Sequence, residues 1–205
     1  MSDKGPVTEN NPLVLASASP RRKMLLDQLQ IPHYVRESTI SEDGMDGEAA
    51  EVAMELARIK ALAVHDAVGP SWVLGADTVV VLGGLILGKP AGREDAFRML
   101  GRLGGNVHNV ITGFCITGPE GSTAHLEAVD TTVKMKALTD EEIEGYIDSG
   151  EPFGKAGSYA IQGLGAFMVE EICGSYTNVV GLPLCELVRA LISSGALLSY
   201  PLKNG

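Results

Sequence analysis

Cysteine is scarce in this chain of 205 residues, and its placement excludes the sites that cysteine usually builds. The cysteines Cys115, Cys173 and Cys185 are odd in number, lie far apart and match no zinc-binding spacing. Each stands in an apolar segment, where an unpaired cysteine packs as a small hydrophobic side chain. We therefore expect buried, reduced thiols, as is typical of a cytoplasmic protein.

Long apolar runs and a secretory signal are also missing. No stretch reaches the roughly 18 uncharged residues that a transmembrane helix needs, so we expect no membrane partner. Residues 1–12 are polar and lack the apolar core of a secretory signal. We expect a flexible leader over residues 1–12 and a single α/β domain over residues 13–205.

Basic charge is in the minority. The chain has 16 Lys and Arg residues against 26 Asp and Glu residues, which makes its formal net charge −10. Such a protein is a poor candidate for sequence-independent binding of DNA or RNA, so we expect no nucleic-acid partner. A small anionic ligand in a locally basic pocket remains compatible with this charge.

The stretch from Leu13 to Leu26 reads LVLASASPRRKMLL and predicts a buried strand, a tight turn and a helix. Ser19 is a good N-cap and Pro20 suits the first helical position. Arg21 and Arg22 then stand where the helix dipole disfavours positive charge. Two readings stay open at this point: exposed surface arginines, or cations that hold an anion at the helix N-terminus.

Three further charged residues stand out from their surroundings. Lys60 borders the apolar stripe of a helix predicted over residues 48–68, where it either reaches solvent or points into a cleft. Asp77 is the one charge in the apolar segment Trp72 to Leu87, which predicts a hairpin. A carboxylate buried there needs a cation, a metal or a cleft. Lys89 follows the hairpin and places an amine near the same end.

The rest of the chain alternates predicted helices and strands. Thr139 and Glu142 form a capping-box pattern for a helix through Ile147, and a glycine-rich loop follows. Glu42 lies in an acidic loop, where such residues are usually solvated. The remaining predictions are a helix over 92–103, strands over 107–117 and 123–135, a strand over 166–172, a loop over 174–183 and a helix over 184–192.

Five short motifs occur in order: SASPRR, GADTVV, GKP, KAGSYAIQG and GSYTNVVGLPL. With them, the stretch from Leu13 to Ile192 resembles the Maf family of nucleoside triphosphate pyrophosphatases. The resemblance implies an α/β fold of the Maf and inosine-triphosphatase type. In that fold a long, mixed, twisted β-sheet is flanked by helices, and two lobes enclose a nucleotide cleft.

The resemblance also implies a site. Water would attack the α-phosphorus of a nucleoside triphosphate and release a monophosphate and pyrophosphate. Glu42 and Asp77 would hold a divalent cation, Mg²⁺ or Mn²⁺, and Asp77 would be the catalytic proton acceptor. The residues expected to contact the triphosphate are Ser17, Arg21, Arg22, Lys60 and Lys89.

Three positions are expected to set the choice of base. Arg21, Thr78 and Gln162 resemble the subgroup that hydrolyses dTTP and UTP, whereas a sister subgroup for 7-methyl-GTP has Trp, Gln and Glu there. The amide of Gln162 offers a donor and an acceptor side by side, which complements the O4 and N3–H edge of thymine or uracil. The expected role is house-cleaning of nucleotide pools, with modified pyrimidine triphosphates left open as substrates.

Two other functions stay open. One is a catalytically weak nucleotide-binding regulator of cell division, although such a protein would be expected to lose Asp77 or Lys89 first. The other is a hydrolase of the inosine-triphosphate type, against which Gln162 and the SASPRR run argue. The resemblance implies a cytoplasmic location and leaves a homodimer open.

Overall fold

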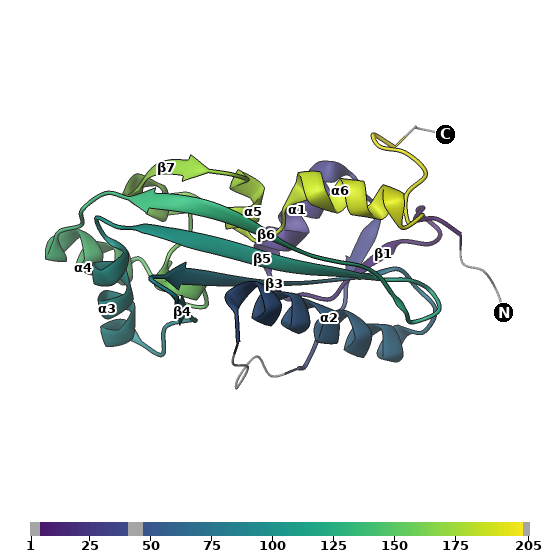
Figure 1. Ribbon diagram of the computed structural model, residues 1–205, viewed down its shortest axis with the longest axis horizontal. Coiled ribbons are helices and arrows are strands. Elements are labelled where there is room, and N and C mark those ends of the chain that lie inside the picture. Colours follow the sequence, from purple (N-terminus) through teal and green to yellow (C-terminus); the bar gives the residue numbers. More distant parts are fainter. Residues whose placement is uncertain (1–4, 41–46, 203–205) are drawn as a thin grey trace. The chain divides into compact units, whose positions relative to one another are not determined.

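The computed structural model describes residues 5–40 and 47–202, and its strands pair into one mixed sheet (Figure 1). The strands pair in the order β2-β1-β3-β5-β6-β7, and β4 pairs with β3 off this path. β1 is parallel to β2 and β3, whereas β4 is antiparallel to β3 and β7 is antiparallel to β6. The described strands are β1 (Leu13–Leu15), β2 (His33–Val35), β3 (Val73–Leu82), β4 (Leu85–Leu87), β5 (Val107–Thr117), β6 (Thr123–Met135) and β7 (Val169–Cys173).

Helices alternate with these strands along the chain, so the predicted mixed α/β class is confirmed. The predicted helices over 48–68, 92–103 and 184–192 are each found to within one residue at either end. The described helices are α1 (Pro20–Leu29), α2 (Ala49–Val68), α3 (Arg93–Leu103), α4 (Asp140–Asp148), α5 (Tyr176–Val180) and α6 (Leu184–Ser193), with short 3₁₀ helices η1 (Ala156–Ser158) and η2 (Gly163–Met168).

The chain divides into two compact units. Unit 1 contains the described residues of 1–77, 112–129 and 181–205, and unit 2 contains residues 78–111 and 130–180. The unit boundaries fall inside β3, β5 and β6. Each of these strands therefore has some residues in unit 1 and the others in unit 2. Asp77 is the last residue of its segment of unit 1, and Thr78 is the first residue of unit 2.

Close packing of α2 against β3 and β5 organises unit 1. A Cβ atom on Gly75 would lie 2.1 Å from the carbonyl oxygen of Ala57, and one on Gly113 would lie 2.3 Å from the carbonyl carbon of Ala53. Ala53, Ala57 and Ala61 are fully buried on the facing side of the helix. Small residues on both surfaces therefore let the helix backbone approach the strands, which brings the side chains of the helix close to β3.

The predicted helix starts are confirmed, with one difference at α1. Pro20 is the first residue of α1 and Ser19 is its N-cap, but the Ser19 side chain makes no capping hydrogen bond. Instead, the N–H of Ser19 donates to Oγ of Ser17 at 3.2 Å. In α4 the expected capping box is present, with Thr139 and Glu142 each accepting a hydrogen bond from the backbone of the other.

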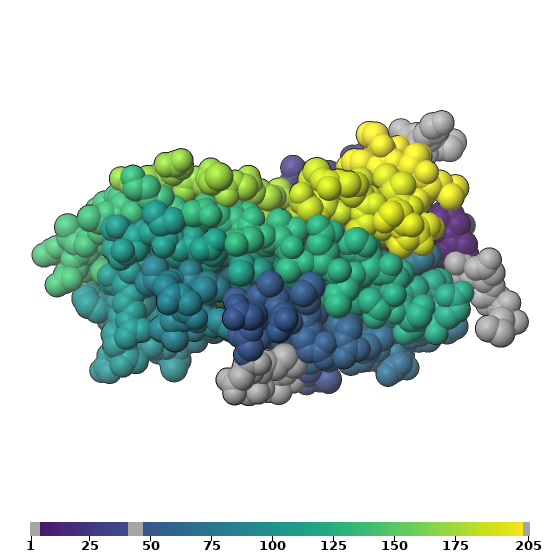
Figure 2. Space-filling view, in the orientation of Figure 1, coloured from purple at the N-terminus to yellow at the C-terminus, as the bar shows by residue number. Residues whose placement is uncertain are grey.

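Three expectations were wrong. The predicted strand over 166–172 begins only at Val169, because residues 163–168 form η2, and helix α5 lies inside the predicted loop over 174–183. Of the cysteines, only Cys115 is buried. Cys173 is exposed on β7, and Cys185 is exposed on α6, a helix that belongs to the yellow part of the chain in Figure 2. Local apolarity did not reveal which side of each element faces solvent.

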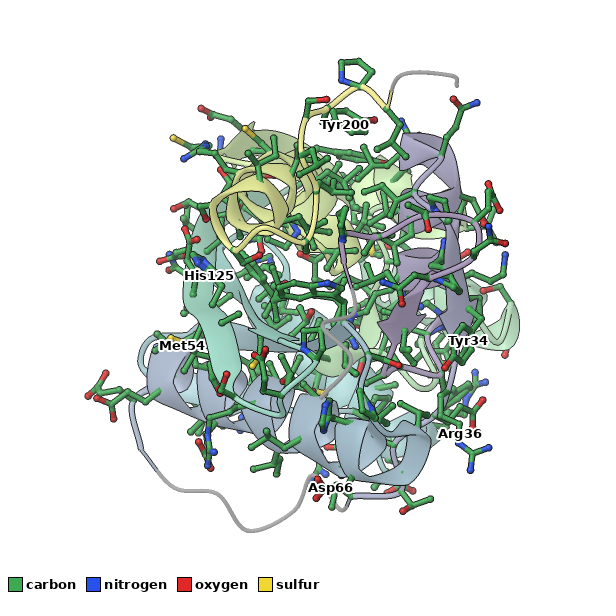
Figure 3. The ribbon with its side chains drawn as sticks, turned by 90° about the vertical axis from the view of Figure 1, so that its right-hand side faces the viewer. Tyr34, Arg36, Met54, Asp66, His125 and Tyr200 are labelled. Carbon is green, nitrogen blue, oxygen red and sulfur yellow. The ribbon has the colours of Figure 1, made fainter. Side chains whose placement is uncertain are left out.

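Residues near both ends of the chain make hydrogen bonds within unit 1. The N–H of Val7, in the segment assigned to the leader, donates to the carbonyl of Ala196 at 2.8 Å. The hydroxyl of Tyr200, which is labelled in Figure 3, donates to the carbonyl of Leu29 at 3.2 Å. Across the described part of the chain, every helix is too short or too polar to cross a membrane.

Candidate active site

A buried ion pair joins α2 to β3. Nζ of Lys60 lies 2.6 Å from Oδ1 of Asp77, and the two residues are only 6% and 8% exposed. Both therefore lie away from bulk solvent, where each charge needs the other. The prediction that Asp77 needs a partner is met by Lys60, and the alternative that Lys60 simply reaches solvent is excluded.

The turn between β1 and α1 presents a second polar group in unit 1. Nη1 of Arg22 donates to Oγ of Ser17 at 3.0 Å, and its Nε donates to the carbonyl of Gly181 at 2.8 Å. Ser17 is buried, and Arg21 beside Arg22 is half-buried. The first turn of α1 has no acidic residue to balance these arginines. The two side chains are therefore not simply solvated at the surface, and they stand at a helix N-terminus, which favours an anion.

Unit 2 carries the other predicted residues. Thr78 is half-buried on β3, Lys89 is exposed just after β4, and Gln162 is half-buried at the N-cap of η2. The N–H of Gly157 donates to the carbonyl of Gly88 at 3.0 Å, so the glycine-rich loop is tied to the residue before Lys89. Unit 2 thus holds the Lys89 segment and the Gln162 loop in one connected structure.

Gly157 has to be glycine for this contact. Its φ of +67° lies in the left-handed region, and a Cβ atom there would lie 3.0 Å from Cγ1 of Val80 on β3.

A buried histidine anchors the same loop. Nε2 of His108 on β5 lies 2.8 Å from the hydroxyl of Tyr159, and the two rings meet edge to face. Burial lowers the pKa of His108 to about 4, so its imidazole is neutral at neutral pH. Burial also raises the pKa of Tyr159, which keeps its hydroxyl protonated. The sequence pattern gave no sign of this pair because its members stand 51 residues apart.

Asp77 is one carboxylate of the kind that a magnesium site uses. Mg²⁺ is commonly bound by one or two protein carboxylates together with substrate phosphates. Within residues 5–40 and 47–202 no group of three or more His, Cys, Asp or Glu side chains could hold a metal by itself. Asp77 fits such a partial site, and the other expected ligand, Glu42, lies outside the described residues.

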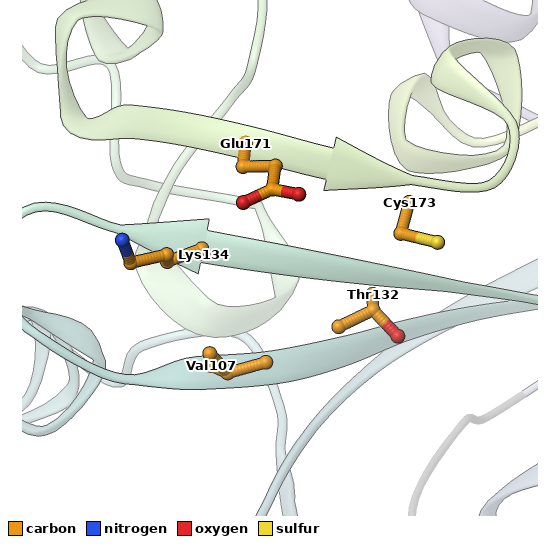
Figure 4. Close-up of a pocket in the computed structure, with 5 residues that line it drawn as sticks. All are labelled: Val107, Thr132, Lys134, Glu171 and Cys173. Carbon is orange, nitrogen blue, oxygen red and sulfur yellow. The ribbon is translucent and has the colours of Figure 1, made fainter.

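A cavity of about 220 Å³ also lies in unit 2 but contains none of the predicted site residues. It opens among β5, β6 and β7 (Figure 4). Its lining is mixed, with an apolar side chain, two charged side chains and an exposed cysteine, and consists of Val107, Thr132, Lys134, Glu171 and Cys173.

Comparison with known proteins gives a consistent result. The model of a family described as "Maf-like protein" matches residues 12–194. A dTTP/UTP pyrophosphatase of Geobacter sulfurreducens is 50% identical over 190 residues, which are 92% of this chain and 100% of the relative. A protein of the same name from Syntrophotalea carbinolica is 46% identical over 202 residues, covering 96% of this chain and 92% of the relative.

Among solved structures, the nucleoside-triphosphatase / dITP/XTP pyrophosphatase of Mycobacterium abscessus aligns with a TM-score of 0.41 and 11% identity. The alignment covers 62% of this chain and 75% of that chain. This likeness is too weak to bear on function.

Proposed function

This chain belongs to the Maf family, and from that premise we propose that it hydrolyses dTTP and UTP to the nucleoside monophosphate and pyrophosphate. The observation that carries the proposal is the similarity to dTTP/UTP pyrophosphatases at about half of all positions and over nearly the whole chain. In the cell this reaction would clear unwanted pyrimidine triphosphates from the nucleotide pool.

The predicted cations would bind the triphosphate. In unit 1, Arg22 is held by Ser17 and Gly181, so its guanidinium is oriented before substrate arrives. Arg21 stands beside it at the N-terminus of α1, where the helix dipole favours an anion. Lys89 would supply a further positive charge. Such positioning and charge neutralisation account for most of the catalysis of phosphoryl transfer.

Asp77 would accept the proton of the attacking water. Its Oδ1 accepts the hydrogen bond of Lys60 at 2.6 Å, which holds the carboxylate in one orientation. Asp77 and Glu42 would also hold the divalent cation. When bound, the cation supplies charge neutralisation at the phosphates and acidifies its water.

The proposal places the protein in the cytoplasm, where nucleoside triphosphates are available, with a homodimer as the assembly to test. No nucleic-acid or membrane partner is needed for the reaction. The net charge of −10 also opposes binding to a polyanion such as DNA or RNA.

Hydrolysis of dTTP and UTP in water enriched in oxygen-18 tests the reaction itself. Attack on the α-phosphorus places the label in the monophosphate, whereas attack on the β-phosphorus places it in pyrophosphate. We expect labelled dTMP and UMP with unlabelled pyrophosphate, measured by mass spectrometry. Label in pyrophosphate would contradict the proposed point of attack. Binding of dTTP without any turnover would favour the regulator of cell division instead.

Removal of divalent cations tests the metal. After exhaustive chelation we expect turnover of dTTP to fall by at least roughly 100-fold, because an uncompensated triphosphate loses several kcal/mol of transition-state stabilisation. Added Mg²⁺ or Mn²⁺ should restore it, while the circular dichroism of the protein stays constant throughout. Full turnover in the chelated protein would exclude the metal role of Asp77 and Glu42.

The substitution Gln162→Glu tests base recognition. It replaces an amide donor by an acceptor-only carboxylate of nearly the same size, so O4 of the base loses its partner. Loss of one buried partner costs about 1–3 kcal/mol, or roughly 5- to 150-fold in kcat/KM. We expect kcat/KM to fall selectively for dTTP and UTP, with GTP affected less or even favoured.

Gln28→Glu is the matched control, because it adds the same charge at an exposed position of α1 in unit 1. For dTTP, UTP, CTP and GTP, we expect the kcat/KM of this variant to stay close to that of the parent protein. An equal fall on all four substrates in Gln162→Glu would mean that Gln162 supports its loop and does not read the base.

A further inference from the structure

Two side chains of unit 2 hold the backbone on both sides of Gln162. Tyr146 lies on α4 and is 3% exposed, and Glu151 follows the end of that helix. The hydroxyl of Tyr146 donates to Oε1 of Glu151 at 2.9 Å, so the two side chains form one unit. We call them the Tyr146–Glu151 pair.

The Tyr146–Glu151 pair binds the chain before Gln162 and after it. On the near side, the N–H of Ala160 donates to the hydroxyl of Tyr146 at 3.2 Å. On the far side, the N–H of Leu164 donates to Oε2 of Glu151 at 3.1 Å and the N–H of Gly165 donates to Oε1 at 2.9 Å. Gln162 is therefore the middle of a short span whose two ends are fixed to the same pair.

Glycine is required where the span closes around the pair. A Cβ atom on Gly165 would lie 2.3 Å from the carbonyl oxygen of Ala160 and 2.8 Å from the hydroxyl of Tyr146. A Cβ atom on Gly163 would lie 2.5 Å from Oε2 of Glu151, and its φ of +72° already disfavours other residues. The span is thus built as a tight wrap around these two side chains.

Glu151 carries its negative charge in this arrangement. Burial acts to raise the pKa of Glu151, but hydrogen bonds from Gly165, Tyr146 and Leu164 outweigh it and lower the pKa below the ordinary value. An ionised carboxylate accepts hydrogen bonds more strongly than a neutral group does. The ionised carboxylate of Glu151 therefore holds the backbone N–H groups of Leu164 and Gly165 by strong hydrogen bonds.

We propose that Tyr146 and Glu151 are positioning residues for base selection, which hold residues 160–165 so that the amide of Gln162 faces the pyrimidine edge. This inference rests on the proposed function, in which Gln162 reads the base. Neither side chain needs to touch the nucleotide. Their effect would reach the substrate through the orientation of Gln162, so it should appear in discrimination between bases more than in turnover as such.

The test measures kcat/KM for dTTP and for dCTP, whose base exchanges the carbonyl at position 4 for an amino group. Glu151→Gln replaces one accepting oxygen by an amide NH₂ group, which cannot accept from the N–H groups of Leu164 or Gly165. Tyr146→Phe removes the hydroxyl that accepts from the N–H of Ala160 and keeps the ring. Each variant leaves at least one N–H of the span without a partner. We expect the dTTP to dCTP ratio of kcat/KM to fall by about 5- to 10-fold in both variants.

Glu144→Gln is the matched control, because Glu144 also lies on α4 but binds Arg93. Its ratio should stay within about twofold of the parent protein. Urea denaturation of every variant separates loss of fold from loss of discrimination.

A double-mutant cycle with Gln162→Ala decides whether the pair acts through Gln162. In the Gln162→Ala background, Glu151→Gln should cause no further loss of the dTTP to dCTP ratio, because the side chain that it positions is gone. An additive loss, or an equal fall for both substrates in either single variant, would overturn the proposal. If Gln162→Ala itself keeps full discrimination, base reading by Gln162 fails and the positioning role fails with it. Absence of pyrophosphate release by the parent protein would instead contradict the proposed function.

Discussion

The ion pair between Lys60 and Asp77 is the interaction on which the candidate site depends. Two buried charges are costly to desolvate, and removing either partner alone typically costs about 3–5 kcal/mol. The pair can form because Gly75 and Gly113 let α2 approach the strands closely, so that Lys60 meets Asp77 at 2.6 Å. The packing of α2 against the strands therefore also fixes the position of the Asp77 carboxylate.

The predicted site residues are distributed over both units. Unit 1 holds the Lys60–Asp77 pair and the arginines at the start of α1, which suit phosphate and water. Unit 2 holds Thr78 and Gln162, and residues on both sides of Gln162 donate hydrogen bonds to Tyr146 of α4 and to Glu151 just after it.

Sequence patterns predicted most of the elements, because strand and helix periodicity is local. They also showed that Asp77 needs a partner, since one charge in a long apolar segment has few alternatives. They did not identify that partner, which depends on the packing of α2. The contacts of Tyr146 and Glu151 with residues 160–165 were missed for the same reason, and the exposure of Cys173 depends on which side of β7 faces solvent.

The turnover number of Asp77→Asn tests the central claim most directly, namely that the Asp77 carboxylate performs the chemistry. Asparagine keeps an oxygen that accepts the hydrogen bond of Lys60, and Asp66→Asn, at an exposed position of α2, is the control. The account predicts that kcat for dTTP falls by at least roughly 100-fold in Asp77→Asn while its urea midpoint shows a folded protein. Near-normal kcat in the folded variant would contradict it and leave Asp77 a purely structural partner of Lys60.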